Sequence, residues 1–351
     1  IQWILQQFVS AGAQEDILYD AKPHVGTDVL LEVVQNLRGR IQALGGEVRF
    51  CSQVTKLHLE GEQLAGVELD TGEMIPCDHA VLAIGHSARD TFETLLSQGV
   101  PMEPKPFAMG VRIEQLQEKI NASQYGTQNV HLPPADYKLV QHLQDSTVYT
   151  FCMCPGGYVV AAASEEGRTV TNGMSYCARN GENANAALLV TVNPQEFPEP
   201  GPLGGMVWQR EIEEAAYRLT GSYQAPAQRV GDFLAGRPSS GPGGVAPTYR
   251  PGVVWTDIHQ CLPPKITKAL EEALPELDRK LQGFGDPDAV LTAPETRSSS
   301  PVRILRDETR QSLIRGLYPT GEGAGYAGGI MSAAIDGIQT AEAILEEMQH
   351  K

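Results

Sequence analysis

Two long segments of the chain repeat hydrophobic residues at helical spacing. The first is residues 27–44, where the apolar positions are Leu30, Val33, Val34, Leu37, Ile41 and Leu44. The second is residues 330–348, where they are Ile330, Ala334, Ile338, Ala341 and Leu345. This spacing predicts two amphipathic helices, and we expect the apolar stripe of the second to be buried in a core. Helical patterns at residues 204–221 and 263–281 predict two more helices.

Short apolar runs between turn signals predict two groups of β-strands. In residues 47–85, the turns "EGEQ" and "DTGE" separate such runs, and "HAVLAIG" ends at Gly85 before a helical pattern. The second group follows three prolines in residues 101–106 and includes "FAMGVRIE", "STVYTFCM", "GYVVAAAS", "TVTNGMS" and "AALLVTV". We expect a strand beginning at Glu47–Phe50, then a β-meander, and an antiparallel sheet or barrel in the second group.

Composition limits the classes of function. The chain has 351 residues and a net charge of −16, which disfavours nucleic acid as a partner. Its length predicts two domains or one split domain. We expect no membrane span, because no run of about 18 uncharged apolar residues occurs. Six scattered cysteines without a recognisable signal peptide are typical of reduced thiols in a cytoplasmic protein, and their spacing indicates no metal site.

The segment "GEGAGYAGGI", residues 321–330, stands between a strand-like run and the last helix. The first N–H groups of a helix are unpaired and attract phosphate where glycines let a ligand approach the backbone. Glu322 is placed to accept hydrogen bonds from sugar-type hydroxyls. The segment therefore suits a ligand that combines a polyol with phosphate. A tight crossover that needs glycine only for packing is the alternative.

Several blocks together resemble a known family. They are "GLYPTGEGAGYAGGIMSAAIDGIQTAEAI", "PETRSSSPVRI", "TFCMCPGGYVV", "TNGMS", "YDAKPHVGTDVL" and "FAMGVRIE". Over nearly the whole chain they resemble a bacterial family of FAD-dependent proteins, also described as NAD(FAD)-utilising dehydrogenases. The resemblance implies a two-dinucleotide-binding-type flavoprotein fold akin to glutathione reductase. It also implies FAD as cofactor and NAD(P)H as a candidate electron donor.

The resemblance further implies roles for individual residues. Gly321 and Glu322 would close onto the ribityl chain and pyrophosphate of FAD. Ala83 and Gly85 match the strand that passes beneath the cofactor, and the backbone of Val54 would meet the adenine. The residues expected to line the flavin are Gly323, Gly325, Tyr326, Ala327, Gly328, Gly329 and Ile330.

The chain departs from the family pattern at one point. Members begin with a strand, a GxGxxG turn and a helix, followed by an acidic residue that holds the adenosine ribose. None of the 351 residues here forms such a unit. We therefore expect this chain to be the C-terminal portion of a longer flavoprotein, with weak or no FAD binding by itself.

Three groups of residues are candidates for chemistry. In "ETRSSSPVR", Arg297 could hold an anionic substrate or stabilise a reduced flavin, and Ser299 could donate a hydrogen bond to a carbonyl; an ordinary hydroxyl-rich turn is the alternative. In "CMC", strand alternation places both sulfurs on one face and indicates buried core thiols, with Cys154 kept as a candidate thiol facing the flavin. The candidate proton carriers, without an evident carboxylate partner, are His24, His86 and His131.

The sequence thus predicts an α/β (α+β) chain with two domains. Residues 1–104 and 285–351 would form an incomplete FAD/NAD(P)-binding Rossmann-like domain, and residues 105–284 an inserted β-rich domain that makes the substrate pocket. We expect hydride or two-electron transfer involving an unknown small-molecule substrate. Two alternatives stay open: a non-catalytic ligand-binding or interaction module without cofactor, and an anion-binding domain that uses the helix start at Gly328.

Overall fold

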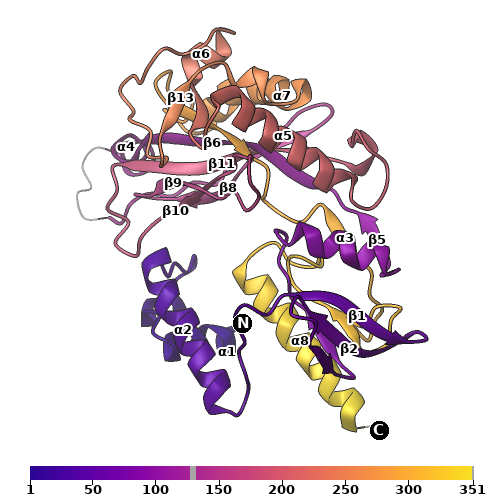
Figure 1. The fold of residues 1–351 in the computed structure, drawn as a ribbon. Helices are drawn as coiled ribbons and strands as arrows, with labels where there is room; N and C mark the ends of the chain where they lie inside the picture. Colours follow the sequence, from indigo (N-terminus) through magenta and orange to yellow (C-terminus); the bar gives the residue numbers. More distant parts are fainter. Residues whose placement is uncertain (127–131, 350–351) are drawn as a thin grey trace.

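The computed structural model describes residues 1–126 and 132–349, so the candidate His131 lies outside the described residues. Figure 1 shows a large sheet with helices above it and a lower part that contains both ends of the chain. Helices and strands are mixed along the sequence, which confirms the predicted mixed α/β class. The Rossmann-like detail of the lower part stays a prediction.

A seven-stranded sheet organises the larger part. In spatial order its strands are β13 (Val253–Trp255), β12 (Ala225–Arg229), β14 (Val290–Glu295), β6 (Phe107–Leu116), β11 (Asn183–Val192), β8 (Thr147–Cys154) and β7 (Val140–His142). β12 and β13 are parallel, and the other neighbours are antiparallel. The central strands β6 and β11 pair along their full length, with Val111 opposite Leu188.

Helices cover one face of this sheet (Figure 1). They are α4 (Gln117–Tyr125), α5 (Gly204–Thr220), α6 (Val230–Leu234) and α7 (Pro264–Lys280), with the short 3-10 helices η2 (Pro194–Glu196) and η3 (Ile258–Gln260). Alternate β6 side chains such as Met109 and Ile113 share one core with Leu270 and Leu274 of α7. The predicted helix at residues 204–221 is confirmed and ends at Gly221 in the left-handed conformation.

The opposite face of the sheet carries buried polar groups and the hairpin of β9 (Tyr158–Ala161) and β10 (Thr171–Met174). Arg112 of β6 is fully buried there, and its guanidinium donates two hydrogen bonds to Glu295 of β14, at 2.7 and 2.8 Å. It also donates to Asn172, Asn185 and the backbone oxygen of Cys152. Arg112 therefore links five strands on the face that looks toward the lower part.

Among the described residues, the lower part contains three small sheets and, besides the first helices of the chain, two further helices. β1 (Val54–Glu60), β2 (Gln63–Leu69) and β3 (Met74–Pro76) form the predicted meander. β4 (Ala80–Leu82) and β16 (Leu317–Pro319) are parallel, whereas β5 (Met102–Pro104) and β15 (Val302–Ile304) are antiparallel. The helices are α3 (Arg89–Ser97) and α8 (Ile330–Gln349). A second core around Leu64, Phe92 and Leu317 joins β1, β2, α3 and the two strand pairs.

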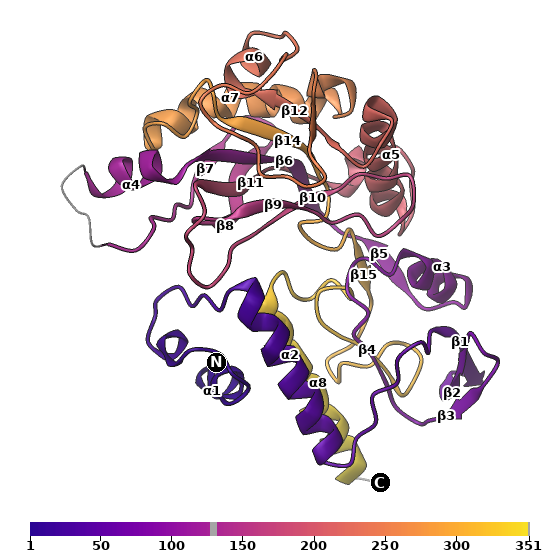
Figure 2. The same ribbon diagram turned by 60° about the vertical axis from the view of Figure 1, so that its left-hand side comes forward.

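The first helices of the chain form a separate cluster below the sheet (Figure 2). It consists of α1 (Gln2–Ser10), the 3-10 helix η1 (Glu15–Leu18) and α2 (Thr27–Ala43), packed around Ile17 and Val33. Met331 of α8 packs against this cluster. At its other end, Asp28 accepts a hydrogen bond from the N–H of Cys177, just after β10, at 2.9 Å. The cluster therefore connects α8 with the underside of the large sheet.

Two expectations about strands differ from the structure. Residues 46–53 form neither helix nor strand, so the strand expected at Glu47–Phe50 is wrong, and Phe50 is 68% exposed. The strand β14 pairs with β6 and β12, so the predicted boundary at residue 285 separates a strand from its own sheet. The second difference concerns strand partners, which local sequence patterns do not specify.

The two long helices are less buried than their apolar patterns suggest, and the core prediction for α8 is wrong in large part. Both helices form, but about half of the α2 stripe is exposed: Val34, Ile41 and Leu44. In α8, only Asp336 and Thr340 are buried among its described residues, while Ile330 and Leu345 of the predicted stripe are exposed. These stripes have the pattern of buried faces, yet the described residues cover only part of them.

Candidate functional site

Two glycine turns meet at the carboxyl ends of the parallel strands β4 and β16. The chain turns at Gly85 (φ 66°) and His86 after β4, and at Gly321 (φ 77°) and Glu322 after β16. Nδ1 of His86 lies 3.3 Å from Oε1 of Glu322. The structure therefore gives the candidate His86 a carboxylate partner that the sequence did not show. The carboxyl ends of neighbouring parallel strands are the usual ligand site of α/β folds.

Glycine serves two different purposes in the 321–330 turn. A Cβ added to Gly323 would lie 2.3 Å from the backbone oxygen of Gly85, and one added to Gly325 would lie 2.7 Å from another backbone oxygen. These two glycines allow protein to pack against protein. A Cβ on Gly328 or Gly329 would meet nothing within 4 Å, and neither residue has a left-handed backbone. Packing therefore explains the first pair, while the second pair leaves open space beside the backbone.

A carboxylate inside α8 fixes this turn. Asp336 is 6% exposed and accepts hydrogen bonds from the N–H of Gly321 at 2.8 Å, from Arg306 at 2.6 and 2.9 Å, and from Arg310 at 2.7 Å. Burial by itself would raise the pKa of Asp336, but these hydrogen bonds lower it to about 2. Arg306 also lies over the ring of Tyr326, 3.7 Å from its centroid. The sequence analysis missed Asp336, although a single acid within the apolar stretch "AAIDGI" was a visible signal.

The residues expected at the adenine end of FAD line a cavity away from the glycine-rich turn. It measures about 350 Å³ and lies between β1, β4 and α3. Val54 lines it, as do Leu82 and Ile84 on either side of Ala83. None of the described residues 321–330 lines it. The structure thus brings Val54 close to the β4 segment, and the cavity that they share is not lined by the glycine-rich turn, which meets the β4 segment at Gly85 instead.

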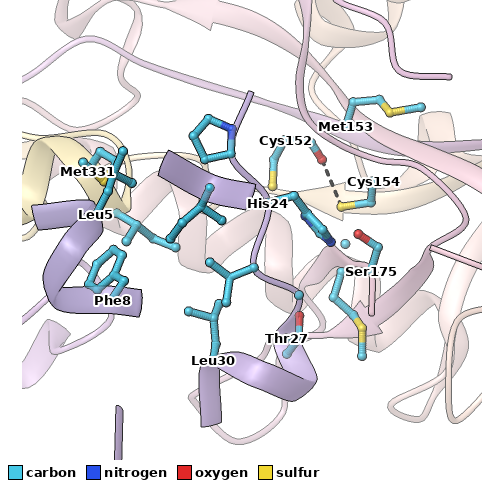
Figure 3. Close-up of a pocket in the computed structure, with 17 residues that line it drawn as sticks. Leu5, Phe8, His24, Thr27, Leu30, Cys152, Met153, Cys154, Ser175 and Met331 are labelled. Atoms are coloured by element: carbon cyan, nitrogen blue, oxygen red, sulfur yellow. Dashed lines mark hydrogen bonds between the residues drawn. The ribbon is translucent and has the colours of Figure 1, made fainter. Parts of the chain in front are cut away.

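The start of α8 lines a second cavity, of about 340 Å³, beneath the large sheet (Figure 3). Leu5, Phe8 and Met331 lie on one side, and Cys154 and Ser175 on the other. The remaining lining residues are Ile17, Pro23, His24, Val25, Gly26, Thr27, Leu30, Cys152, Met153, Gly173, Met174 and Ile330. This cavity is where the segment expected to line the flavin meets the β-rich part of the chain.

The two thiols of "CMC" have different surroundings. Cys152 is exposed with a left-handed backbone (φ 44°), whereas Cys154 is buried. The Cys154 thiol donates a hydrogen bond to the backbone oxygen of Cys152 at 3.3 Å (Figure 3). The neighbouring Cys154 side chain, together with the positive charge of Arg112, holds the pKa of the Cys152 thiol well below its usual range, although partial desolvation of the sulfur opposes this. The hydrogen bond to Cys152 and burial raise the pKa of Cys154. The expected pair of equivalent core thiols is therefore replaced by an exposed thiol and a buried one.

His24 is the third candidate histidine. Its Nε2 lies 3.2 Å from the backbone oxygen of Tyr176, and burial, opposed in part by this hydrogen bond, lowers the pKa of His24. Because a carbonyl only accepts, Nε2 is the protonated nitrogen in this contact. His24 thus enters the cavity beside the thiols as a neutral imidazole at neutral pH.

The predicted catalytic arginine is held by protein groups. Nη1 of Arg297 donates to Ser87 Oγ at 3.0 Å, and Nη2 donates to Ser164 Oγ at 2.5 Å. Burial, followed by the charge of Arg89, lowers the pKa of Arg297. Ser299 is half-buried, and neither Arg297 nor Ser299 lines the two cavities described above. Their catalytic roles stay predictions; the contacts themselves attach the 297–300 loop to the residue after His86.

The described residues also bear on metal binding and on membrane insertion. Within residues 1–126 and 132–349, no three His, Cys, Asp or Glu side chains gather closely enough to hold a metal ion. In the same described ranges, no helix combines the length and the apolar character that crossing a bilayer requires. All six cysteines are free thiols.

Two solved structures are distantly similar to this chain. An oxidoreductase from Methanosarcina mazei is 12% identical, with a TM-score of 0.34, over 90% of this chain and 54% of that one. The lathipeptide tryptophan 5-halogenase MibH is also 12% identical, with a TM-score of 0.34, over 90% of this chain and 37% of that one. At this level of similarity neither structure supports an argument about this chain.

Sequence relatives are more informative. A Clostridium beijerinckii protein described as "Uncharacterized protein" is 49% identical over 98% of this chain. The chain spans 66% of the length of that relative. A family model described as "FAD-dependent protein, C-terminal domain-like" matches residues 106–298, which contain the whole seven-stranded sheet. The chain therefore belongs to this family of FAD-dependent proteins.

Proposed function

We propose that this chain is the C-terminal part of an FAD-dependent oxidoreductase that performs two-electron transfer on a small-molecule substrate. The observation that carries the proposal is the meeting of the two glycine turns at β4 and β16, next to the open glycines that precede α8, in a chain of an FAD-dependent family. Bound FAD would supply the electron transfer, and the protein would supply binding and orientation.

The residues at this edge fit the polar half of FAD. Nδ1 of His86 is buried and has no hydrogen-bond partner among the described residues, although Glu322 lies within ion-pair distance. Glu322 itself is partly exposed and would accept hydrogen bonds from the ribityl hydroxyls. The N–H of Gly328 is taken by the hydroxyl of Ser332 at 3.3 Å. The free donors for a pyrophosphate would therefore be the next N–H groups, at the start of α8.

The cavity beneath the sheet is the proposed substrate pocket. Ile330 and Met331 directly follow the glycine-rich turn and line this cavity. Its other walls are formed by β8 and β10 of the β-rich part and by α1. A substrate held there would be shielded from water by Leu5, Phe8 and Met331. This arrangement supports the expectation that the β-rich part forms the substrate side of the site.

We further propose that polypeptide outside these 351 residues completes the flavin site. β4 and β16 form only a two-stranded pair, with Val81 of β4 47% exposed. The exposed apolar residues of α2 and α8 lie in the same part of the molecule, and the Clostridium relative is longer than this chain. A GxGxxG unit would add strands beside this pair, cover the apolar stripes and provide the main pyrophosphate donors.

Flavin binding tests the proposal. We would titrate FAD into this chain and into the same chain extended by its natural upstream sequence, and follow the quenching of flavin fluorescence. We expect weak or no binding by this chain and tight binding by the longer one. In the longer protein, Glu322→Ala should weaken FAD binding about tenfold or more, because a hydrogen bond to a charged group contributes about 1.5–3 kcal/mol.

The control for this experiment is Glu346→Ala, which removes an exposed carboxylate further along α8. It should leave FAD binding unchanged. A longer protein that binds no FAD, or equal FAD affinity in the Glu322 and Glu346 variants, would overturn the assignment. If FAD binds, NADH and NADPH are the first electron donors to test, by the loss of flavin absorbance.

A further inference from the structure

Cys152 lies between two cavities of different character. The first is the largely apolar cavity that contains Leu5, Phe8 and Met331. The second measures about 440 Å³, and its described lining residues include the cationic Lys22, Lys138 and Arg179 and a single carboxylate, Asp136. Cys152 and its neighbour Met153 line both cavities. A small molecule with an apolar and an anionic portion could therefore approach this sulfur from either side.

The backbone at Cys152 is held in an unusual conformation. Its φ of 44° is in the left-handed region, which residues other than glycine seldom adopt. The pairing of β8 with β11 is irregular at the same place, between Asn185 and Ala187. The buried Arg112 donates a hydrogen bond to the backbone oxygen of Cys152 at 2.9 Å. Such conformations persist where the surrounding structure fixes them, and they are frequent at functional sites.

The surroundings also favour a charged sulfur at position 152. The buried Cys154 thiol, which donates a hydrogen bond to the backbone oxygen of Cys152 at 3.3 Å, lowers the pKa of the Cys152 thiol. Arg112 contributes positive charge that Glu295 partly neutralises. Lys22 and Arg179 line the polar cavity, and Lys22 forms an ion pair with Asp136 at 2.8 Å. His24 lines both cavities as a neutral imidazole. Apart from Glu295 and Asp136, both of them paired, the charged groups named here are cationic.

We propose that Cys152 and Cys154 form a thiol–disulfide exchange site, in which Cys152 attacks a small disulfide bound in these cavities and Cys154 completes the reaction. In the first step, the Cys152 thiolate forms a bond to one sulfur of the disulfide and the S–S bond breaks. The departing thiolate takes the proton of Cys154. The Cys154 thiolate then attacks the Cys152 sulfur, a Cys152–Cys154 disulfide forms, and the second thiol leaves with the proton that Cys152 had released.

The electrons and atoms of this exchange balance without any further reactant. The two cysteines are oxidised to a disulfide, and the substrate disulfide is reduced to two thiols. The exchange requires no bound flavin, so it goes beyond the proposed oxidoreductase function and can be tested separately.

The test uses the reduced chain without added FAD and dithiodipyridine, an aromatic disulfide that releases a coloured thiopyridone. At pH 6.5, peptide mass mapping should show that Cys152 reacts about tenfold faster than an ordinary exposed thiol, because the gain in thiolate fraction exceeds the loss in nucleophilicity. Cys51 is the matched internal control, since it is also exposed and has a left-handed backbone (φ 51°) but lines neither of these cavities. This comparison needs no variant and thus no refolding.

Variants then separate the two steps. In the wild-type chain, two thiopyridones should leave in the fast phase, and the peptide with both cysteines should lose two hydrogens. Cys154→Ser should release one thiopyridone and keep a stable adduct on Cys152, and Cys152→Ser should show no fast phase. Equal reaction rates at Cys152 and Cys51, or a stable Cys152 adduct in the wild-type chain, would overturn the proposal. Neither result would affect the flavin proposal.

Discussion

The two parts of the molecule use similar apolar residues in different ways. In the sheet part, every residue of β11 except Thr191 is buried, and helices α5 and α7 cover its apolar face. In the lower part, α2 and α8 have equally regular apolar stripes, but Leu345 is 58% exposed whereas Leu188 of β11 is fully buried. The comparison teaches that the periodic pattern predicts the helix or strand, while burial depends on whether a partner is present.

The same contrast applies to charge. In the sheet part, the ion pair of Arg112 with Glu295 is fully buried and sits among further hydrogen bonds. In the lower part, Arg49 and Glu73 form an ion pair of the same length, 2.7 Å, in contact with solvent. The N–O distance is the same in the two ion pairs. The difference in burial should therefore decide how much the loss of one partner lowers the free energy of unfolding.

The largest expected effect is on the buried ion pair. Arg112→Met leaves Glu295 buried without a partner and should lower the free energy of unfolding by about 3–5 kcal/mol. Arg49→Met, the matched exposed variant, should change it by less than about 1 kcal/mol. Urea unfolding followed by circular dichroism measures both. Equal losses would show that the two parts do not differ in the way described.

The next effect concerns the two leucines. Leu188→Ala creates a cavity in the sheet core and should cost about 2–5 kcal/mol. Leu345→Ala on α8 should stay within about 0.5 kcal/mol, because its side chain is largely exposed. Urea unfolding followed by circular dichroism measures both changes in stability. A large loss of stability for Leu345→Ala would mean that another surface covers α8 in solution. If the measured stability also depends on protein concentration, that surface belongs to a second copy of the chain.

A smaller effect on the free energy of unfolding is expected at Asp336, a buried and fully hydrogen-bonded carboxylate of the lower part. Asp336→Asn removes charged hydrogen bonds to Gly321, Arg306 and Arg310 and should cost about 1.5–3 kcal/mol at pH 7. Because the folded-state pKa of Asp336 is lowered to about 2, its stabilisation is present above the unfolded pKa and is lost as the pH falls toward 2.

Thermal unfolding at pH 7, pH 4 and pH 2.5 measures this dependence. The difference between the wild-type chain and Asp336→Asn should shrink over the acidic range. Asp20→Asn, at an exposed position, should show no such trend. A difference that stays constant with pH would contradict the assigned role of Asp336.

The smallest effect separates two glycines of one turn. Gly325→Ala should destabilise the chain by about 1 kcal/mol or more, because its φ is 84° and a Cβ would lie 2.7 Å from a backbone oxygen. Gly329→Ala should leave stability nearly unchanged, because its Cβ meets nothing within 4 Å. In the longer protein we expect Gly329→Ala to weaken FAD binding. Unchanged FAD affinity for Gly329→Ala would favour packing as the only reason for these glycines.

Much of the local structure could be predicted from the sequence. Helices α2, α5, α7 and α8, the meander β1–β3 and the central strands β6 and β11 follow from periodicity and from turn residues. The same holds for the glycine turns at Gly85 and Gly321, which need left-handed backbone conformations. These features depend on neighbours within a few residues, so a local pattern is enough to specify them.

The site was predicted only in part, for a corresponding reason. The sequence marked Glu322 and the "CMC" thiols, but it did not show that His86 faces Glu322 or that Asp336 anchors Gly321. The prediction of two equivalent thiols was also wrong. It assumed a regular strand at Cys152, but the backbone there is left-handed. The contacts of His86 with Glu322 and of Asp336 with Gly321 join residues that are far apart in the sequence, so no local pattern shows that they meet in space.

By itself, then, the sequence determined which segments become helices, strands and glycine turns, and the family to which the chain belongs. The tertiary structure decided which strands pair, placing β14 in the large sheet, and which thiol is exposed beside the cavity. It also decided that the stripes of α2 and α8 remain partly uncovered. The physical reason is that secondary structure follows from local backbone and side-chain periodicity, whereas burial and reactivity depend on contacts between distant segments.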